Sequence, residues 1–140
     1  MSDAYSNPYF CGNHLDDNFS KMANWVNNRP MDSVQVIPAD GAIALTEGTV
    51  ILTKGSAAAI TGIAPTAGSH ANGGDDGNRL WIVSATNFAH VVTFPANSVM
   101  GPSGAKHIVT MVPGGAALGF MVVAYNGAWY LQYISNGTLT

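Results

Sequence analysis

The stretch Phe120–Ile134, FMVVAYNGAWYLQYI, carries the strongest structural signal in this chain of 140 residues. Two runs rich in valine, tyrosine and other β-prone residues flank the pair Asn126-Gly127. β-Branched and aromatic residues favour strands. An Asn-Gly pair accepts the positive φ angles of the tight turn that joins two antiparallel strands. We therefore predict a β-hairpin here and interpret the rest of the chain outward from it.

The second strand of this hairpin has two different faces. Because side chains alternate along a strand, Trp129, Leu131 and Tyr133 fall on one face, which is predicted to be core. Tyr130 and Gln132 fall on the opposite face. Tyr130 is therefore a candidate residue for a protein interface or for stacking on a glycan.

The chain from residue 33 to residue 140 has the same strand-and-turn character. Three short β-prone segments resemble one another, and each ends in threonine: 42–46, 50–53 and 58–61. Further strands are predicted at 80–86, 90–94 and 108–112. Short strands at this spacing are typical of an all-β fold, here a small antiparallel sandwich or barrel that is jelly-roll-like. The three similar segments predict a meander or the edge of a sandwich. They also allow a β-solenoid, although so few copies do not establish one.

Residues 1–32 differ from this β domain, and we predict an N-terminal extended arm with one short helix over about residues 14–29. Apolar residues at helical spacing form one stripe, Asn13 can cap its start, and Pro30 stops it. The stripe can pack on the chain's own domain, on a neighbouring subunit or on a capsid. The candidate interface residues of this segment are Tyr5, Tyr9, Phe10, Leu15, Phe19, Met22, Trp25 and Val26.

The composition narrows the class of protein. Charged residues make up only 9% of the chain and hydrophobic residues 47%, with a formal net charge of −3. Ordinary domains carry roughly 25% charged residues, so this surface is easily desolvated and suits packing against other subunits. The five cations are scattered, which argues against a nucleic-acid partner. The longest apolar run, 114–125, is shorter than the ~20 residues of a membrane-spanning helix, so no membrane contact is expected.

Neither a metal site nor a catalytic site is predicted. His70, Asp75 and Asp76 are the best local ligand set, but they lack the spacing of a calcium loop and are interpreted as a flexible turn. Ser103 and His107 lack the order of a nucleophile elbow. Cys11 is the single cysteine and lies in the arm. We therefore expect no enzyme activity and no cofactor.

His90 lies among the β-prone residues of the segment 90–94. A lone histidine in a strand is usually a hydrogen-bonded structural residue. The alternative is a contact at a subunit interface, where a proton gained near pH ~6.5 would matter. We favour the structural interpretation and keep the interface as a candidate role.

Several segments of the β domain resemble the capsid decoration (cement) proteins and head-fibre proteins of tailed bacteriophages, over roughly residues 40–135. The segments that carry this resemblance are Asp40–Ile43, Gly48–Ala58, Gly77–Thr86, Ala89–Thr93 and Ala124–Tyr130. The resemblance implies a structural protein of the virion, made in the host cytoplasm and placed on the outer capsid surface. Its implied partners are the major capsid protein and further copies of itself in a homotrimer.

Two other classes of function remain open. A fibre, spike or adhesion module would bind host glycan through exposed aromatic residues and the loop 64–78. A small hydrolase would need a triad or a metal centre that the sequence does not display. The resemblance brings no catalytic residues with it.

Overall fold

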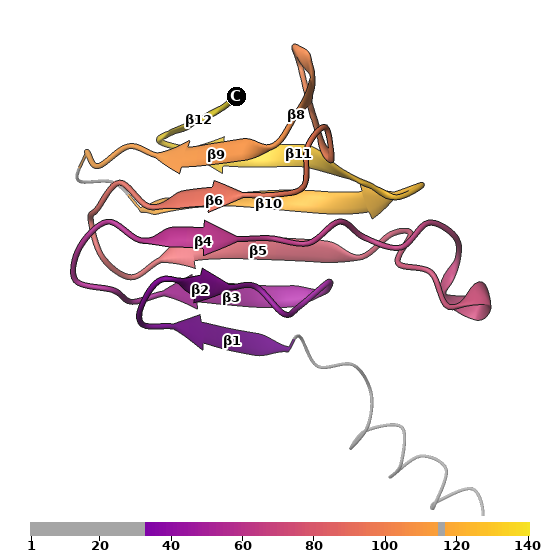
Figure 1. Cartoon of the computed structure of the whole chain (residues 1–140), viewed down its shortest axis with the longest axis horizontal. Coiled ribbons are helices and arrows are strands. Elements are labelled where there is room, and N and C mark those ends of the chain that lie inside the picture. Colours follow the sequence, from indigo (N-terminus) through magenta and orange to yellow (C-terminus); the bar gives the residue numbers. More distant parts are fainter. Residues whose placement is uncertain (1–32, 115–116) are drawn as a thin grey trace, which may run out of the picture. The chain divides into compact units, whose positions relative to one another are not determined.

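The computed structural model describes residues 33–114 and 117–140, which form an all-β domain (Figure 1). The predicted arm and helix of residues 1–32 lie outside the described residues. Asp32–Thr140 is a compact unit by itself. Within its described part the only helical element is the 3-10 turn η1 (His70–Asn72). No helix of the described residues has the length and apolar character needed to cross a membrane.

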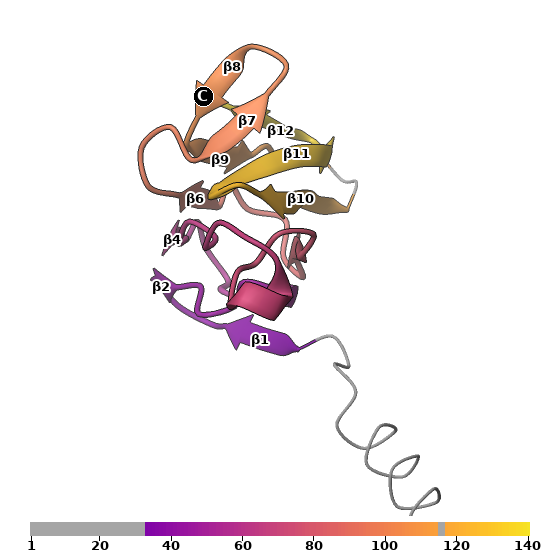
Figure 2. The same cartoon turned by 90° about the vertical axis from the view of Figure 1, so that its right-hand side faces the viewer.

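Two sheets pack on each other as a sandwich, which confirms the predicted all-β fold class (Figure 2). The seven-stranded sheet has the order β1-β3-β5-β10-β11-β7-β8. Its strands are β1 (Val34–Ile37), β3 (Gly48–Leu52), β5 (Arg79–Ser84), β10 (Leu118–Tyr125), β11 (Ala128–Ser135), β7 (Val99–Gly101) and β8 (Gly104–Lys106). The five-stranded sheet has the order β12-β9-β6-β4-β2. Its strands are β12 (Gly137–Leu139), β9 (Ile108–Met111), β6 (Val91–Thr93), β4 (Ala59–Thr61) and β2 (Gly41–Ala42).

The first six strands wind between the two sheets in three coils. β1, β3 and β5 are parallel neighbours in one sheet, and β2, β4 and β6 are parallel neighbours in the other. The chain therefore changes sheet after each of these strands, as in a β-solenoid, and the segments 42–46, 50–53 and 58–61 do not form a meander. The sheets are mixed rather than antiparallel throughout. A period-two pattern assigns side chains to faces but does not select the neighbouring strand, so the sequence allowed both arrangements.

The C-terminal half supplies the antiparallel part of both sheets. β10 and β11 form the predicted hairpin, and Asn126 and Gly127 have the positive φ angles of 50° and 82° that its turn requires. β10 also pairs antiparallel with β5, so this strand joins the parallel coils to the hairpin. In the other sheet, β9 pairs antiparallel with both β6 and β12.

A β-bulge in the hairpin changes which side chains face the core. The register shifts between Met121 and Val122, which pair with Tyr133 and Leu131, so one additional residue, Gln132, is inserted on β11. An inserted residue reverses the inward and outward alternation beyond it. Tyr133 is 51% exposed, and its predicted place in the core is therefore wrong.

The core lies between the two sheets. Its fully buried side chains include Val50, Leu52, Ile60, Leu80, Ile82, Val92, Val109 and Val122. Phe94 and Phe120 meet edge to face, with ring centroids 6.2 Å apart. Trp129 is buried, and its indole Nε1 donates a hydrogen bond to the carbonyl oxygen of Ile63 at 2.7 Å. This bond ties the hairpin to the segment that follows β4.

Replacement of Trp129 by Phe tests the importance of this bond. We expect Trp129→Phe to lower the free energy of unfolding by about 1–3 kcal/mol, because the Ile63 carbonyl loses its donor inside the protein. The matched control is Tyr130→Phe, which removes a hydroxyl from an exposed ring at the next position and should change stability by less than about 0.5 kcal/mol. Urea unfolding followed by circular dichroism measures both. Equal losses in the two variants would contradict this assignment.

Candidate functional site

The outward-facing side of the seven-stranded sheet, here called the outer face, is apolar over five neighbouring strands. Paired residues of adjacent strands point their side chains to the same side of the sheet. The register therefore builds one row from Val34, Thr49, Trp81, Met121 and Tyr133. A second row consists of Val36, Ile51, Val83, Gly119 and Ser135.

Four aromatic rings lie on the outer face in two pairs. The ring centroids of Trp81 and Tyr133 are 6.1 Å apart, and those of Tyr125 and Tyr130 are 6.2 Å apart. The four side chains are between 38% and 61% exposed, so they do not belong to the core. Contiguous apolar surface of this kind marks interaction sites on proteins. The outer face is therefore the candidate functional site.

A hollow of about 300 Å³ interrupts the outer face near the start of β10. Its wall includes Trp81, Val83, Leu118 and Tyr133, and Gly119 lies among them. A Cβ atom on Gly119 would lie 2.7 Å from the carbonyl oxygen of Ile82. The close approach of β5 therefore requires glycine here, and the missing side chain leaves an apolar recess beside projecting rings.

The opposite side of the sandwich provides a comparison within the same chain. The outward side chains of the five-stranded sheet are mostly small and hydroxylated, and they include Thr61, Thr93, Thr110 and Thr138. No aromatic residue occurs in its strands. On the outer face, Arg79 is the only charged residue among the described outward positions of β1, β3, β5, β10 and β11. Exposed aromatic side chains in the described strands thus occur on the seven-stranded sheet and not on the five-stranded sheet.

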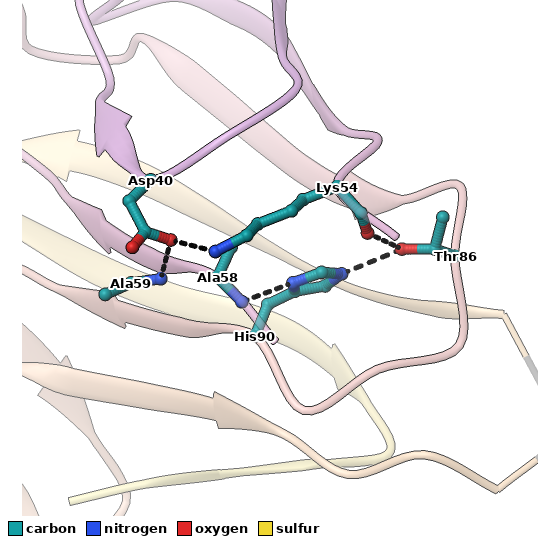
Figure 3. A network of polar contacts seen from close by, with 6 residues as sticks. All are labelled: Asp40, Lys54, Ala58, Ala59, Thr86 and His90. Atoms are coloured by element: carbon teal, nitrogen blue, oxygen red, sulfur yellow. Dashed lines mark hydrogen bonds and ion pairs between the residues drawn. The ribbon is translucent and has the colours of Figure 1, made fainter. Parts of the chain in front are cut away.

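His90 lies in a buried polar network at one end of the sandwich (Figure 3). Its Nδ1 accepts a hydrogen bond from the backbone N–H of Ala58 at 3.1 Å. Its Nε2 lies 3.0 Å from the hydroxyl of Thr86, and that hydroxyl donates to the carbonyl oxygen of Lys54 at 2.8 Å. Since the hydroxyl proton is used on Lys54, Nε2 must carry the proton of a neutral ring. The geometry gives His90 a structural role, as the favoured interpretation expected.

A surface ion pair borders this network. The Nζ of Lys54 lies 2.7 Å from Oδ1 of Asp40, which also accepts the N–H of Ala59 at 3.0 Å. These hydrogen bonds, that from Lys54 first, hold the pKa of Asp40 below 3.8. Burial, and secondly the positive charge of Lys54, lower the pKa of His90 below 6.5. The neutral histidine and the ionised aspartate therefore both favour the folded state near neutral pH.

Hydrogen bonds organise the loop 64–78. The carboxylate of Asp75 accepts the N–H of Thr66 at 2.7 Å, and Asp76 accepts the N–H of Asn126 at 2.8 Å. The first bond lies within the loop, and the second fastens the predicted flexible turn to the β10–β11 hairpin. Across residues 33–114 and 117–140, no three His, Cys, Asp or Glu side chains are close enough together to hold a metal ion.

The predicted site residues fall into three groups. Tyr130 is exposed and lies on the outer face, whereas His90 is buried. The eight candidate residues of the arm and helix lie outside the described residues. Sequence reasoning did not select Trp81 and Tyr133 for this site. The alternation along β5 predicts that Trp81 faces away from the core, because its neighbours Leu80 and Ile82 are buried. The bulge that turns Tyr133 outward has no such signal in the local sequence.

Comparison of this chain with protein-family models, with curated proteins and with solved structures finds no match.

The His90 network predicts an acid-sensitive stability. The folded state holds the ring neutral, so stability is complete above the usual pKa of 6.5 and is lost as the pH falls toward the lowered folded value. Asp40 does not contribute in this window, because its own transition lies below 3.8. Urea unfolding from about pH 7.5 to about pH 5.5 should show this decrease in wild type.

The same measurement on His90→Gln should show a smaller dependence on pH, because the titrating ring is gone. The control is His107→Gln, which removes a half-buried histidine between β8 and β9 and shows whether the loss of another histidine has the same effect. If His90→Gln retained the full slope, another group would cause it.

Proposed function

We propose that this protein is a structural, non-enzymatic assembly protein that decorates the outer surface of a phage capsid. The observation that supports an assembly role most directly is the outer face, where four exposed aromatic side chains lie together on one sheet. These exposed rings do not stabilise the isolated domain. Contact with another protein would remove them from solvent, and burial of apolar surface contributes a favourable free energy of about 25 cal/mol per Å².

The weak charge of the chain supports the same role. Charged side chains lose hydration on burial, and a chain with only 9% charged residues has few groups that incur this penalty. Net affinity would still be reduced by the ordering of side chains and segments at the contact. A wide interface between many copies offsets this loss, as a shell of repeated subunits requires.

The finer assignment to a capsid comes from the sequence resemblance. In this proposal the β domain associates with further copies as a trimer, and the N-terminal segment, residues 1–32, attaches to the major capsid protein. Tyr5, Phe10, Phe19 and Trp25 supply apolar side chains for that attachment. Such a protein clamps neighbouring capsid subunits mechanically and requires no catalytic residue.

Removal of residues 1–29 tests the attachment. We expect the full chain to sediment with purified capsids and the shortened chain to remain in the supernatant. Asp32–Thr140 is a compact unit, so the shortened chain should keep its β-type circular dichroism spectrum. Unchanged sedimentation of the shortened chain would exclude the arm as the attachment, and failure of the full chain to bind capsids would exclude the decoration role.

The paired aromatics also favour a second candidate, a fibre or adhesion module. Tyr125 and Tyr130, with ring centroids 6.2 Å apart, form an exposed platform on which sugar rings could stack. Under this alternative a glycan array shows specific binding that Tyr130→Ala abolishes and Tyr133→Ala, on the other aromatic pair, reduces less. Absence of binding to the array counts against this class.

A further inference from the structure

The outer face carries two complementary shapes at opposite ends of the β10–β11 hairpin. The hollow lies at Gly119, near the start of β10, whereas Tyr125 ends the same strand and contacts Tyr130. Gly119 and Tyr125 lie six residue steps apart, which is roughly 20 Å at the usual rise of a strand. One surface thus presents a recess and a projecting pair of rings.

We propose that the Tyr125–Tyr130 pair of one copy packs into the hollow around Gly119 of a second copy. A second copy of this chain is then the occupant of the outer face. The inference deepens the proposed assembly role and rests on it, because it names the partner that this face meets.

The area of the outer face agrees with such a contact. Five strands at ~4.8 Å spacing and roughly 20 Å of strand length give on the order of 1,000 Å² for two copies together. A specific protein interface needs about that much buried surface. Sheets of the same hand of twist also pack face to face at a small angle, so two copies of one twisted sheet match in shape.

The charges of the face permit the contact. Its described outward positions on the five strands carry no carboxylate, and Arg79 is their single charged group. Two copies therefore meet without burying an acidic side chain, and the long stem of an arginine allows its charged end to reach solvent. Exposed aromatic rings that enter an apolar recess are the usual centre of binding energy in protein interfaces.

The geometry also accounts for a closed assembly. Each copy carries this hollow and this tyrosine pair, so each copy can donate to one contact and accept in another. Two copies related by a two-fold axis satisfy both, and a ring of three does so as well. In both assemblies each hollow receives the tyrosine pair of a neighbouring copy.

The first experiment measures the mass of the full chain in solution by sedimentation velocity over a wide range of concentration. We expect a closed oligomer, at two or three times the chain mass of 14.5 kDa. Val83→Arg places a charge in the wall of the hollow and should give a monomer. The matched control Val91→Arg changes a valine of similar burial on the other sheet and should keep the wild-type mass. A monomeric wild type, or an oligomer that Val83→Arg leaves intact, overturns the proposal.

The second experiment uses milder variants, so that it does not depend on the folding of Val83→Arg. Dissociation constants are measured for Val83→Ala, Tyr125→Ala and the double variant. Within one copy these residues are roughly 20 Å apart, and side chains that distant act independently. Contact between copies predicts that the double variant departs from the product of the single effects by a factor of about 2 or more. Strict additivity overturns the contact.

The outcome of the capsid sedimentation experiment is independent of the two experiments on self-association. A monomer that still sediments with capsids overturns the self-contact and leaves the decoration role in place. The opposite result is an oligomer in which the substitutions at Val83 and Tyr125 are non-additive but which does not sediment with capsids. That result confirms the self-contact and excludes the decoration role.

Discussion

The pairing of β10 is the constraint on which the rest of the domain depends. This strand pairs antiparallel with β5 on one side and with β11 on the other, and so joins the parallel coils to the hairpin. One register places Phe120 and Val122 in the core and leaves Gly119 and Tyr125 on the outer face. A shift by one residue would exchange these two sets, so the register is fixed by the buried set and the outer face follows from it.

The sequence predicted the parts of the fold that local chemistry controls. The Asn126-Gly127 turn identified the hairpin because few residue pairs accept two successive positive φ angles. The strand-and-turn character of residues 33–140 identified the all-β class. It could not identify the three parallel coils, because β1, β3 and β5 pair with one another although β2 and β4 lie between them in the chain. Pairing between such distant segments depends on packing against the whole core rather than on any local pattern.

The candidate site was predicted in part, for a similar reason. Alternation along β11 placed Tyr130 outward and Trp129 in the core, and both residues lie there. The same alternation failed three residues later, because the bulge at Gln132 turns Tyr133 to the side of Tyr130. The position of a bulge depends on how β10 and β11 pack in three dimensions. A local sequence pattern does not contain this information. The face with its two aromatic pairs therefore becomes visible only in three dimensions.

The two sides of the sandwich show that the outer face is not a by-product of folding. Outward positions contribute little to the core, so threonine serves as well as tryptophan there, and the five-stranded sheet carries threonine at four such positions. Threonine at the outward positions of the seven-stranded sheet would make a monomer more soluble. The exposed rings instead raise the free energy of the isolated domain in water, and contact with another surface removes this penalty. The difference between the two faces supports the proposal of a partner on the seven-stranded side.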